Sequence, residues 1–208
     1  GMALLDQLRR EVTAALKRAE TMIALSKEQG FPLMVEMGDL LRGWSLVMQG
    51  CPEEGIALMR RVMANKQVDI DNSERPVFYA LLVEAYGAVG QAEEGLRTVA
   101  EALALVEKTG FRFYQAELSR LQGELLLRQA APDNLQAETC FHRALEHARS
   151  QQAKSLELRA AMSLSRLWQQ QSKREEARKL LAEIYGWFTE GFDTADLKEA
   201  KALLEKLA

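Results

Sequence analysis

Apolar residues recur along the chain with the spacing of amphipathic helices. Over residues 4–29 the apolar positions follow a period close to 3.6 residues, and Gly30 ends the run. Further breaks come at Gly50-Cys51-Pro52 and at Gly110. The pattern predicts a long first helix over 4–29. Later helices are expected at 31–49, 53–66, 76–89, 91–108, 111–129, from a cap at Asp133 or Asn134 to 151, 154–171, 173–188, and after a cap at Asp193 or Thr194.

Small residues repeat in register along these helices. The second helix of each expected pair has one near its start, and the intervals are 40, 42 and 40 residues: Gly55, Gly95, Ala137 and Ala177. Seven residues later come Val62, Ala102, Ala144 and Ile184, and the first helices carry Gly43, Val83, Gly123 and Ser165 at matching places. Two helices pack closely only where the contacting side chains are small. The register therefore predicts an all-α stack of helix pairs.

These residues resemble tetratricopeptide repeats (TPRs). The stretches LLVEAYGAVGQAEEGL and AETCFHRALEHA carry the resemblance best, although the interval here exceeds the usual family period of about 34 residues. Longer repeats of this kind resemble those of maltose-activator-like regulators. The resemblance implies a right-handed superhelical solenoid of antiparallel helix pairs with about four repeats, an N-terminal helix and a C-terminal capping helix. We expect one repeat domain over residues 1–208. It would consist of an N-terminal helix at 1–30, helix pairs at 31–67, 73–110, 111–152 and 153–188, and a capping helix at 193–208.

The C-terminal quarter carries a second resemblance. The motif WFTEGFDT, from Trp187 to Thr194, is followed by Asp196-Leu197. It is similar to the C-terminal region of bacterial multidomain signalling proteins that join an adenylate cyclase or kinase-like module to a P-loop ATPase and a repeat domain. This chain contains no GxxxxGK[ST] loop. The resemblance therefore implies a sensor or scaffold region, with the ATPase or cyclase as a partner in cis.

Composition excludes several classes of partner. A net charge of −3 gives no basic excess to attract nucleic acid phosphates, and no run of roughly twenty apolar residues could span a membrane. The N-terminus lacks the layout of a signal peptide. Cys51 and Cys140 have no second cysteine nearby, so two reduced thiols are expected. We expect a cytoplasmic protein without a nucleic acid or membrane partner.

The sequence offers little for catalysis or metal binding. His142 and His147 are the only histidines, and on a helix they point about 140° apart. Cys140 lies two residues from His142, which a helix directs elsewhere. Asp69 and Asp71 begin like a calcium loop, but the glycine and the closing glutamate are missing. Ser119, Ser163 and Ser165 fall within helices, not on strained turns. We expect no catalytic residue, no metal, no cofactor and no enzyme activity.

The TPR resemblance also implies a binding surface. In these repeats the residues just after the small contact, and those one turn before it, line a concave groove. Here those positions are Leu40, Trp44, Ala80, Glu84, Arg120, Glu124, Met162 and Arg166; Arg128 and Arg159 are expected to flank them. Arginine can fork onto carboxylates and an aromatic side chain can anchor an interface. The groove therefore suits an extended peptide or a helix of a protein partner.

Two alternatives stay open at this point. Repeat domains of maltose-activator-like regulators bind a small effector, and an apolar cavity lined by Trp44 and Met48 would favour such a sensor here. Self-association as a homodimer is the other alternative, because the apolar face of the first helix has no preceding repeat to cover it. The TPR resemblance makes a non-catalytic scaffold or regulatory module of a bacterial signalling protein the preferred interpretation.

Overall fold

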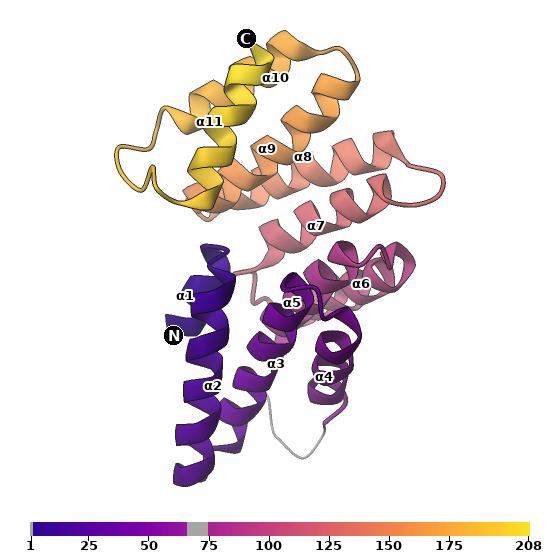
Figure 1. Cartoon of the computed structure of the whole chain (residues 1–208). Coiled ribbons are helices and arrows are strands. Elements are labelled where there is room, and N and C mark those ends of the chain that lie inside the picture. Colours follow the sequence, from indigo (N-terminus) through magenta and orange to yellow (C-terminus); the bar gives the residue numbers. More distant parts are fainter. Residues whose placement is uncertain (1, 66–74) are drawn as a thin grey trace. The chain divides into compact units, whose positions relative to one another are not determined.

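Every regular element in the described part of the chain is an α-helix, as the apolar periodicity predicts (Figure 1). The computed structural model describes residues 2–65 and 75–208. The helices are α1 (Met2–Leu8), α2 (Val12–Gln29), α3 (Pro32–Met48), α4 (Pro52–Ala64), α5 (Arg75–Ala88), α6 (Ala92–Thr109), α7 (Gln115–Leu127), α8 (Asn134–Ser150), α9 (Lys154–Gln170), α10 (Arg174–Tyr185) and α11 (Ala195–Leu207). None of these described helices is long and apolar enough to cross a membrane.

The helices form two compact units, Gly1–Gly110 and Phe111–Ala208. In the first unit α1 packs on α2, α2 on α3, α3 on α4 and α5 on α6, and α5 also contacts α3 and α4. Its core gathers Trp44, Met59, Phe78 and Tyr86 from three of these helices. In the second unit each of α7 to α10 packs on the next helix, and α9 also contacts α7 and α11. Within each unit, consecutive helices are therefore neighbours in space, which is the arrangement of stacked helix pairs.

The predicted register of small residues is confirmed by the close contacts between paired helices. A methyl group at Gly43 would lie 2.8 Å from the carbonyl oxygen of Gly55. The Ser165 hydroxyl of α9 donates to the Ala177 carbonyl of α10 at 3.1 Å. All four register residues of the second helices are buried: Gly55, Gly95, Ala137 and Ala177. Each pair is thus joined where a larger side chain would hold the two helices apart.

The N-terminal segment differs from its prediction. Where the sequence predicts one helix over residues 4–29, the chain turns between α1 and α2. Arg10 adopts a left-handed backbone with φ of 62°, and the Glu11 amide donates to the Asp6 carbonyl at 2.8 Å. Periodicity could not reveal this turn, because neither glycine nor proline marks it. α1 packs on α2, and Ala15 of α2, which lies 40 residues before Gly55, is fully buried, so α1 and α2 form a further helix pair.

Helix ends follow the expected signals at several places. Gly30 and Gly110 end their helices in the left-handed conformation, each with φ of 71°. Of the two residues considered as the cap of α8, Asp133 fills the role and accepts from the Gln136 amide at 2.9 Å. α7 begins at Gln115, four residues later than predicted. The segment with Asp69 and Asp71, considered above as the start of a calcium loop, lies outside the described residues.

Gly123 tests the interlocking contact directly. A Cβ there would lie 2.5 Å from the Phe141 ring, so Gly123→Ala should lower the free energy of unfolding by about 1–3 kcal/mol. Urea denaturation checks this. Phe141→Leu in the same chain should recover part of the loss, since it gives the new methyl group room. Equal losses in the presence and absence of Phe141→Leu would mean that the two residues are not coupled.

Candidate functional site

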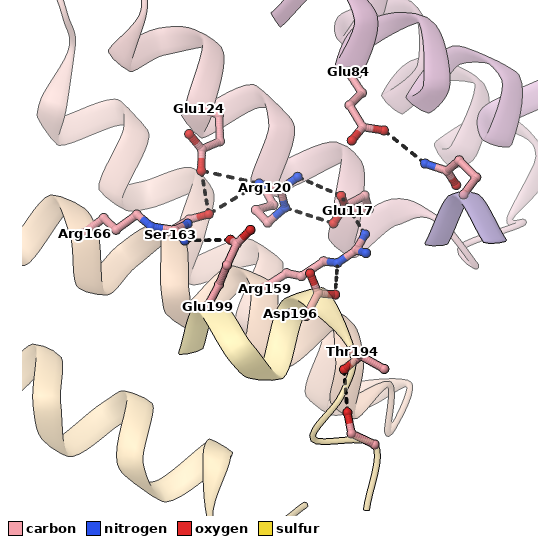
Figure 2. A network of polar contacts seen from close by, with 12 residues as sticks. Glu84, Glu117, Arg120, Glu124, Arg159, Ser163, Arg166, Thr194, Asp196 and Glu199 are labelled. Atoms are coloured by element: carbon pink, nitrogen blue, oxygen red, sulfur yellow. Dashed lines mark hydrogen bonds and ion pairs between the residues drawn. The ribbon is translucent and has the colours of Figure 1, made fainter. Parts of the chain in front are cut away.

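Charged side chains collect on one side of the second unit, where its helices α7, α9 and α11 lie next to one another. We call this surface the polar face: Glu117, Arg120, Glu124, Arg159, Ser163, Arg166, Asp196 and Glu199 (Figure 2). On α7 the first three of these stand at spacings of three and four residues, which brings them to one side of the helix. On α9 the next three stand at spacings of four and three residues, with the same consequence.

Arg120 holds the α7 part of the polar face together. Its Nη2 and Nε donate to the two oxygens of Glu117 at 2.7 Å and 3.0 Å, in a forked arrangement. Its Nη1 lies 3.4 Å from Glu124 Oε1 and 3.4 Å from Ser163 Oγ. The Ser163 hydroxyl in turn donates to Glu124 at 2.6 Å. These contacts connect α7 to α9 through polar groups as well as through the apolar core.

Arg159 extends the network to the last helix. Its Nε donates to Asp196 of α11 at 2.7 Å, and its Nη1 lies 3.5 Å from Glu117 (Figure 2). Two turns further along, Arg166 contacts Glu199 of α11 at 3.1 Å. The α9 arginines are thus paired with acidic residues of neighbouring helices, which places opposite charges next to one another.

The pKa values of Glu117 and Arg159 are both shifted within this network. Burial by itself would raise the pKa of its carboxyl, but Arg120 and then Arg159 outweigh that effect and lower the pKa to about 2 from its usual 4.5. Burial would likewise lower the pKa of the Arg159 guanidinium, while Glu117 and Asp196 raise it. Both groups therefore stay charged at neutral pH. A buried network of this kind keeps its geometry only while each charge retains its partner.

Most of the polar face is shielded, and its accessible part lies at one end. The Arg120 and Arg159 side chains are 14% and 10% exposed, whereas Arg166 is 44% and Glu199 is 42% exposed. Arg120, Glu124 and Arg166, predicted from the sequence, lie on this one surface. Met162 is buried with 3% exposure. A partner approaching this face would meet Arg166 and Glu199 first.

The groove residues expected in the first unit are placed differently. Leu40, Trp44 and Ala80 are buried, and Trp44 has only 1% exposure. The Trp44 indole donates to Glu84 at 2.9 Å, and Gln7 of α1 donates to the same oxygen at 3.0 Å. α1 contacts α3, which carries Trp44. The unpredicted turn before α2 brings α1 onto this side, so Trp44 is part of the core and cannot serve as a surface anchor in this conformation.

The sequence prediction misses half of the polar face. The predicted groove residues do not include Glu117, Ser163, Asp196 and Glu199. Arg159 is predicted only to flank the groove. The interval between Glu117 and Arg159 is 42 residues, equal to one of the repeat intervals. Applying the register to every charged position would therefore have found this pair. The contribution of α11 has no such signal, because the loop before it departs from the repeat.

Three of the residues considered for chemistry, Cys140, Ser163 and Ser165, are buried and hydrogen-bonded, whereas Cys51 is exposed. Cys140 is buried and its thiol donates to Gln122 at 3.4 Å; burial raises the pKa of this thiol, which disfavours the reactive thiolate. The Ser163 and Ser165 hydroxyls are held by Glu124 and by the Ala177 carbonyl. Within the part of the chain that the structure describes, no three histidine, cysteine or acidic side chains are grouped so that they could hold a metal ion.

Comparison with known proteins identifies the fold. The sequence matches no protein-family model and no curated protein. Among solved structures, two forms of a putative kinesin light chain with nearly identical TPR-like repeats from Podosopora anserina are similar. One form has a TM-score of 0.60 at 17% identity, and the other has 0.55 at 19%; each match covers 89% of this chain and 90% of that chain. The chain therefore has a TPR-like repeat fold, as predicted.

A third similar structure is much larger than this chain. It is a signal transduction ATPase with numerous domains and a TPR sensor from Pyrococcus horikoshii, with a TM-score of 0.37 at 15% identity. The match covers 97% of this chain and 38% of that chain. At this TM-score the similarity supports no further conclusion about this chain.

The pKa of Glu117 gives a prediction for acid stability. Since its pKa is lowered from 4.5 to about 2, Glu117 stabilises the fold above pH 4.5, and this contribution of about 3 kcal/mol is lost as pH falls through 2. The Glu117→Gln chain should therefore be less stable than the parent at pH 7, and the difference should shrink toward pH 2. Denaturant unfolding of both proteins over this range checks it. A difference that stays constant with pH would contradict the paired charge.

Proposed function

We propose that this chain is a non-catalytic protein-interaction module that binds a peptide or helix of a partner protein. The observation that supports this proposal is the polar face of a TPR-like unit, at whose end Arg166 and Glu199 are accessible. TPR-like stacks present a long surface made from several helices, which suits an extended partner. The buried Cys140 thiol and the hydrogen-bonded hydroxyls of Ser163 and Ser165 are poorly placed for catalysis, which favours a role in binding.

Arg166 is the most exposed arginine of the polar face and is therefore the one that a partner can reach. Its guanidinium has five N–H donors, and the contact with Glu199 uses Nη2. With 44% of the side chain exposed, this ion pair contributes little to stability and can be exchanged at small cost. A carboxylate of the partner could therefore take the place of Glu199 or share the guanidinium with it.

We further propose that the module works within a bacterial signalling protein, with a P-loop ATPase or adenylate cyclase module in cis. The support is the resemblance of the segment from Trp187 to Leu197 to the C-terminal region of such proteins. This context is separate from the binding surface itself and can be tested separately.

Charge reversal at Arg166 tests the binding surface. Arg166→Glu should weaken capture of the partner roughly 10- to 100-fold, the loss of one charge-assisted hydrogen bond, while thermal stability stays nearly unchanged. Quantitative pull-down from extracts of the source cells, read by mass spectrometry, checks it. Arg178→Glu is the matched control, because Arg178 is 50% exposed on α10 away from the polar face. Equal capture by all three proteins would count against the polar face.

Self-association is a second candidate, and one observation favours it. Leu25 of α2 and Phe31 before α3 are each 57% exposed, so this corner of the first unit presents large apolar groups to water. Light scattering across a concentration series distinguishes a homodimer from a monomer. The sensor alternative receives no such support, because Trp44 is packed in the core and its indole is already bonded to Glu84.

A further inference from the structure

α11 is attached to the second unit by one apolar side. Four residues of this side are buried: Leu197, Ala200, Leu203 and Leu207. They pack toward α9 and α10, the two helices that α11 contacts. Its other side is polar and exposed at Lys198, Lys201 and Glu205. α11 therefore contributes a single amphipathic surface to the fold, whereas α9 is contacted by four helices.

The charges of α11 match those of the helix it covers. Asp196 pairs with Arg159 and Glu199 pairs with Arg166, so two carboxylates three residues apart meet two arginines seven residues apart. Both acids lie in the N-terminal half of α11, where the helix dipole also favours negative charge. The α9 surface thus recognises an amphipathic helix with two carboxylates near its N-terminus by two features, an apolar strip and two positive charges.

The connection to α11 is long and exposed. Residues 186–194 join α10 to α11, and Trp187 and Phe192 within them are 59% and 46% exposed. The Trp187 ring packs on its neighbour Phe188, and the Phe192 ring packs on Tyr185 at the end of α10. Nine residues can span about 30 Å when extended. The connection is therefore long enough for α11 to move away from α9 and α10 while it stays joined to α10.

From these observations we propose that the α9–α10 surface beneath α11 is a docking site for an amphipathic helix of a partner protein that carries two carboxylates near its N-terminus, and that α11 is its built-in competitor. The proposal rests on the proposed function and names its partner. The partner helix carries carboxylates at positions i and i+3 and apolar residues at i+1, i+4, i+7 and i+11, the pattern of α11 itself. In the resting chain α11 occupies the site, and a partner must displace it.

Competition of this kind lowers the apparent affinity for the partner. The affinity falls in proportion to the fraction of molecules in which the site is open. A chain whose α11 is loosened should bind an added helix more tightly than the parent chain does. This behaviour distinguishes a displaceable helix from a permanent cap. If α11 stayed in place in the parent chain and in the variant, an added helix would find no site in either.

The experiment uses the full chain and a labelled peptide of residues 193–208 as the probe. Leu203→Asp should loosen α11, because Leu203 is 6% exposed against its neighbours. By fluorescence anisotropy this variant should bind the peptide at least about tenfold more tightly than the parent. Ala202→Asp is the matched control on the exposed side of the same helix and should behave like the parent. No binding by a folded Leu203→Asp chain would overturn the proposal.

A charge exchange makes the test specific to the proposed contacts. In the Leu203→Asp chain, Arg166→Glu should weaken peptide binding, and a peptide with Glu199→Arg should restore it. Restored binding supports the ion pair as a recognition element. Equal binding of the unchanged peptide to the Leu203→Asp chains with and without Arg166→Glu overturns it. Should circular dichroism show that Leu203→Asp unfolds the second unit, the chain with Asp196→Lys and Glu199→Lys replaces it, because like charges then face Arg159 and Arg166.

The same measurements separate the partner helix from a second copy of this chain. A wild-type dimer in light scattering that becomes a monomer with Leu203→Asp would identify the occupant as α11 of another copy, which overturns the partner proposal. The proposed function has a different readout, capture of the partner by the parent chain. Lack of peptide binding together with Arg166-dependent capture would therefore remove this inference and leave the proposed function in place.

Discussion

Two helices can cross closely only where the side chains between them are small, and the paired helices of this chain depend on that constraint. A methyl group at Gly43 would collide with the Gly55 carbonyl oxygen, and one at Gly55 would collide with the Gly43 carbonyl oxygen. At Gly123 the space is filled by the Phe141 ring, and at Ser165 a hydroxyl bonds to the facing backbone. The chemistry differs from pair to pair, but each solution allows a short distance between helix axes.

Close pairing determines where the charged residues come together. Once each pair is fixed, the first helices of successive pairs pack side by side, as α7 and α9 do in the second unit, with α11 next to α9. Residues separated by one repeat interval then become neighbours, which brings Glu117 next to Arg159. Burying these charges is unfavourable, and the alternation of acidic and basic groups across the helices compensates for it. The polar face is in this sense a consequence of the helix packing.

The interval of about forty residues is sufficient to predict the helix pairs, because steric contact leaves a direct mark on residue size. The turn at Arg10 could not be predicted in the same way, since the apolar period continues through it and no glycine is present. Trp44, expected at a surface, lies in the core of the first unit, where Gln7 of α1 shares Glu84 with the Trp44 indole. The role of α11 is equally hidden, because the pairing of Asp196 with Arg159 depends on the conformation of a loop outside the repeat.

The most direct measurement of the central constraint is the free energy of unfolding of the Ala177→Leu chain. Ala177 is fully buried, and its carbonyl accepts the Ser165 hydroxyl at the crossing of α9 and α10. The larger side chain should force the helices apart and lower the free energy of unfolding by about 1–3 kcal/mol. Ala182→Leu on the exposed side of α10 should leave it nearly unchanged. Equal stability of the Ala177→Leu chain and the parent would contradict the account.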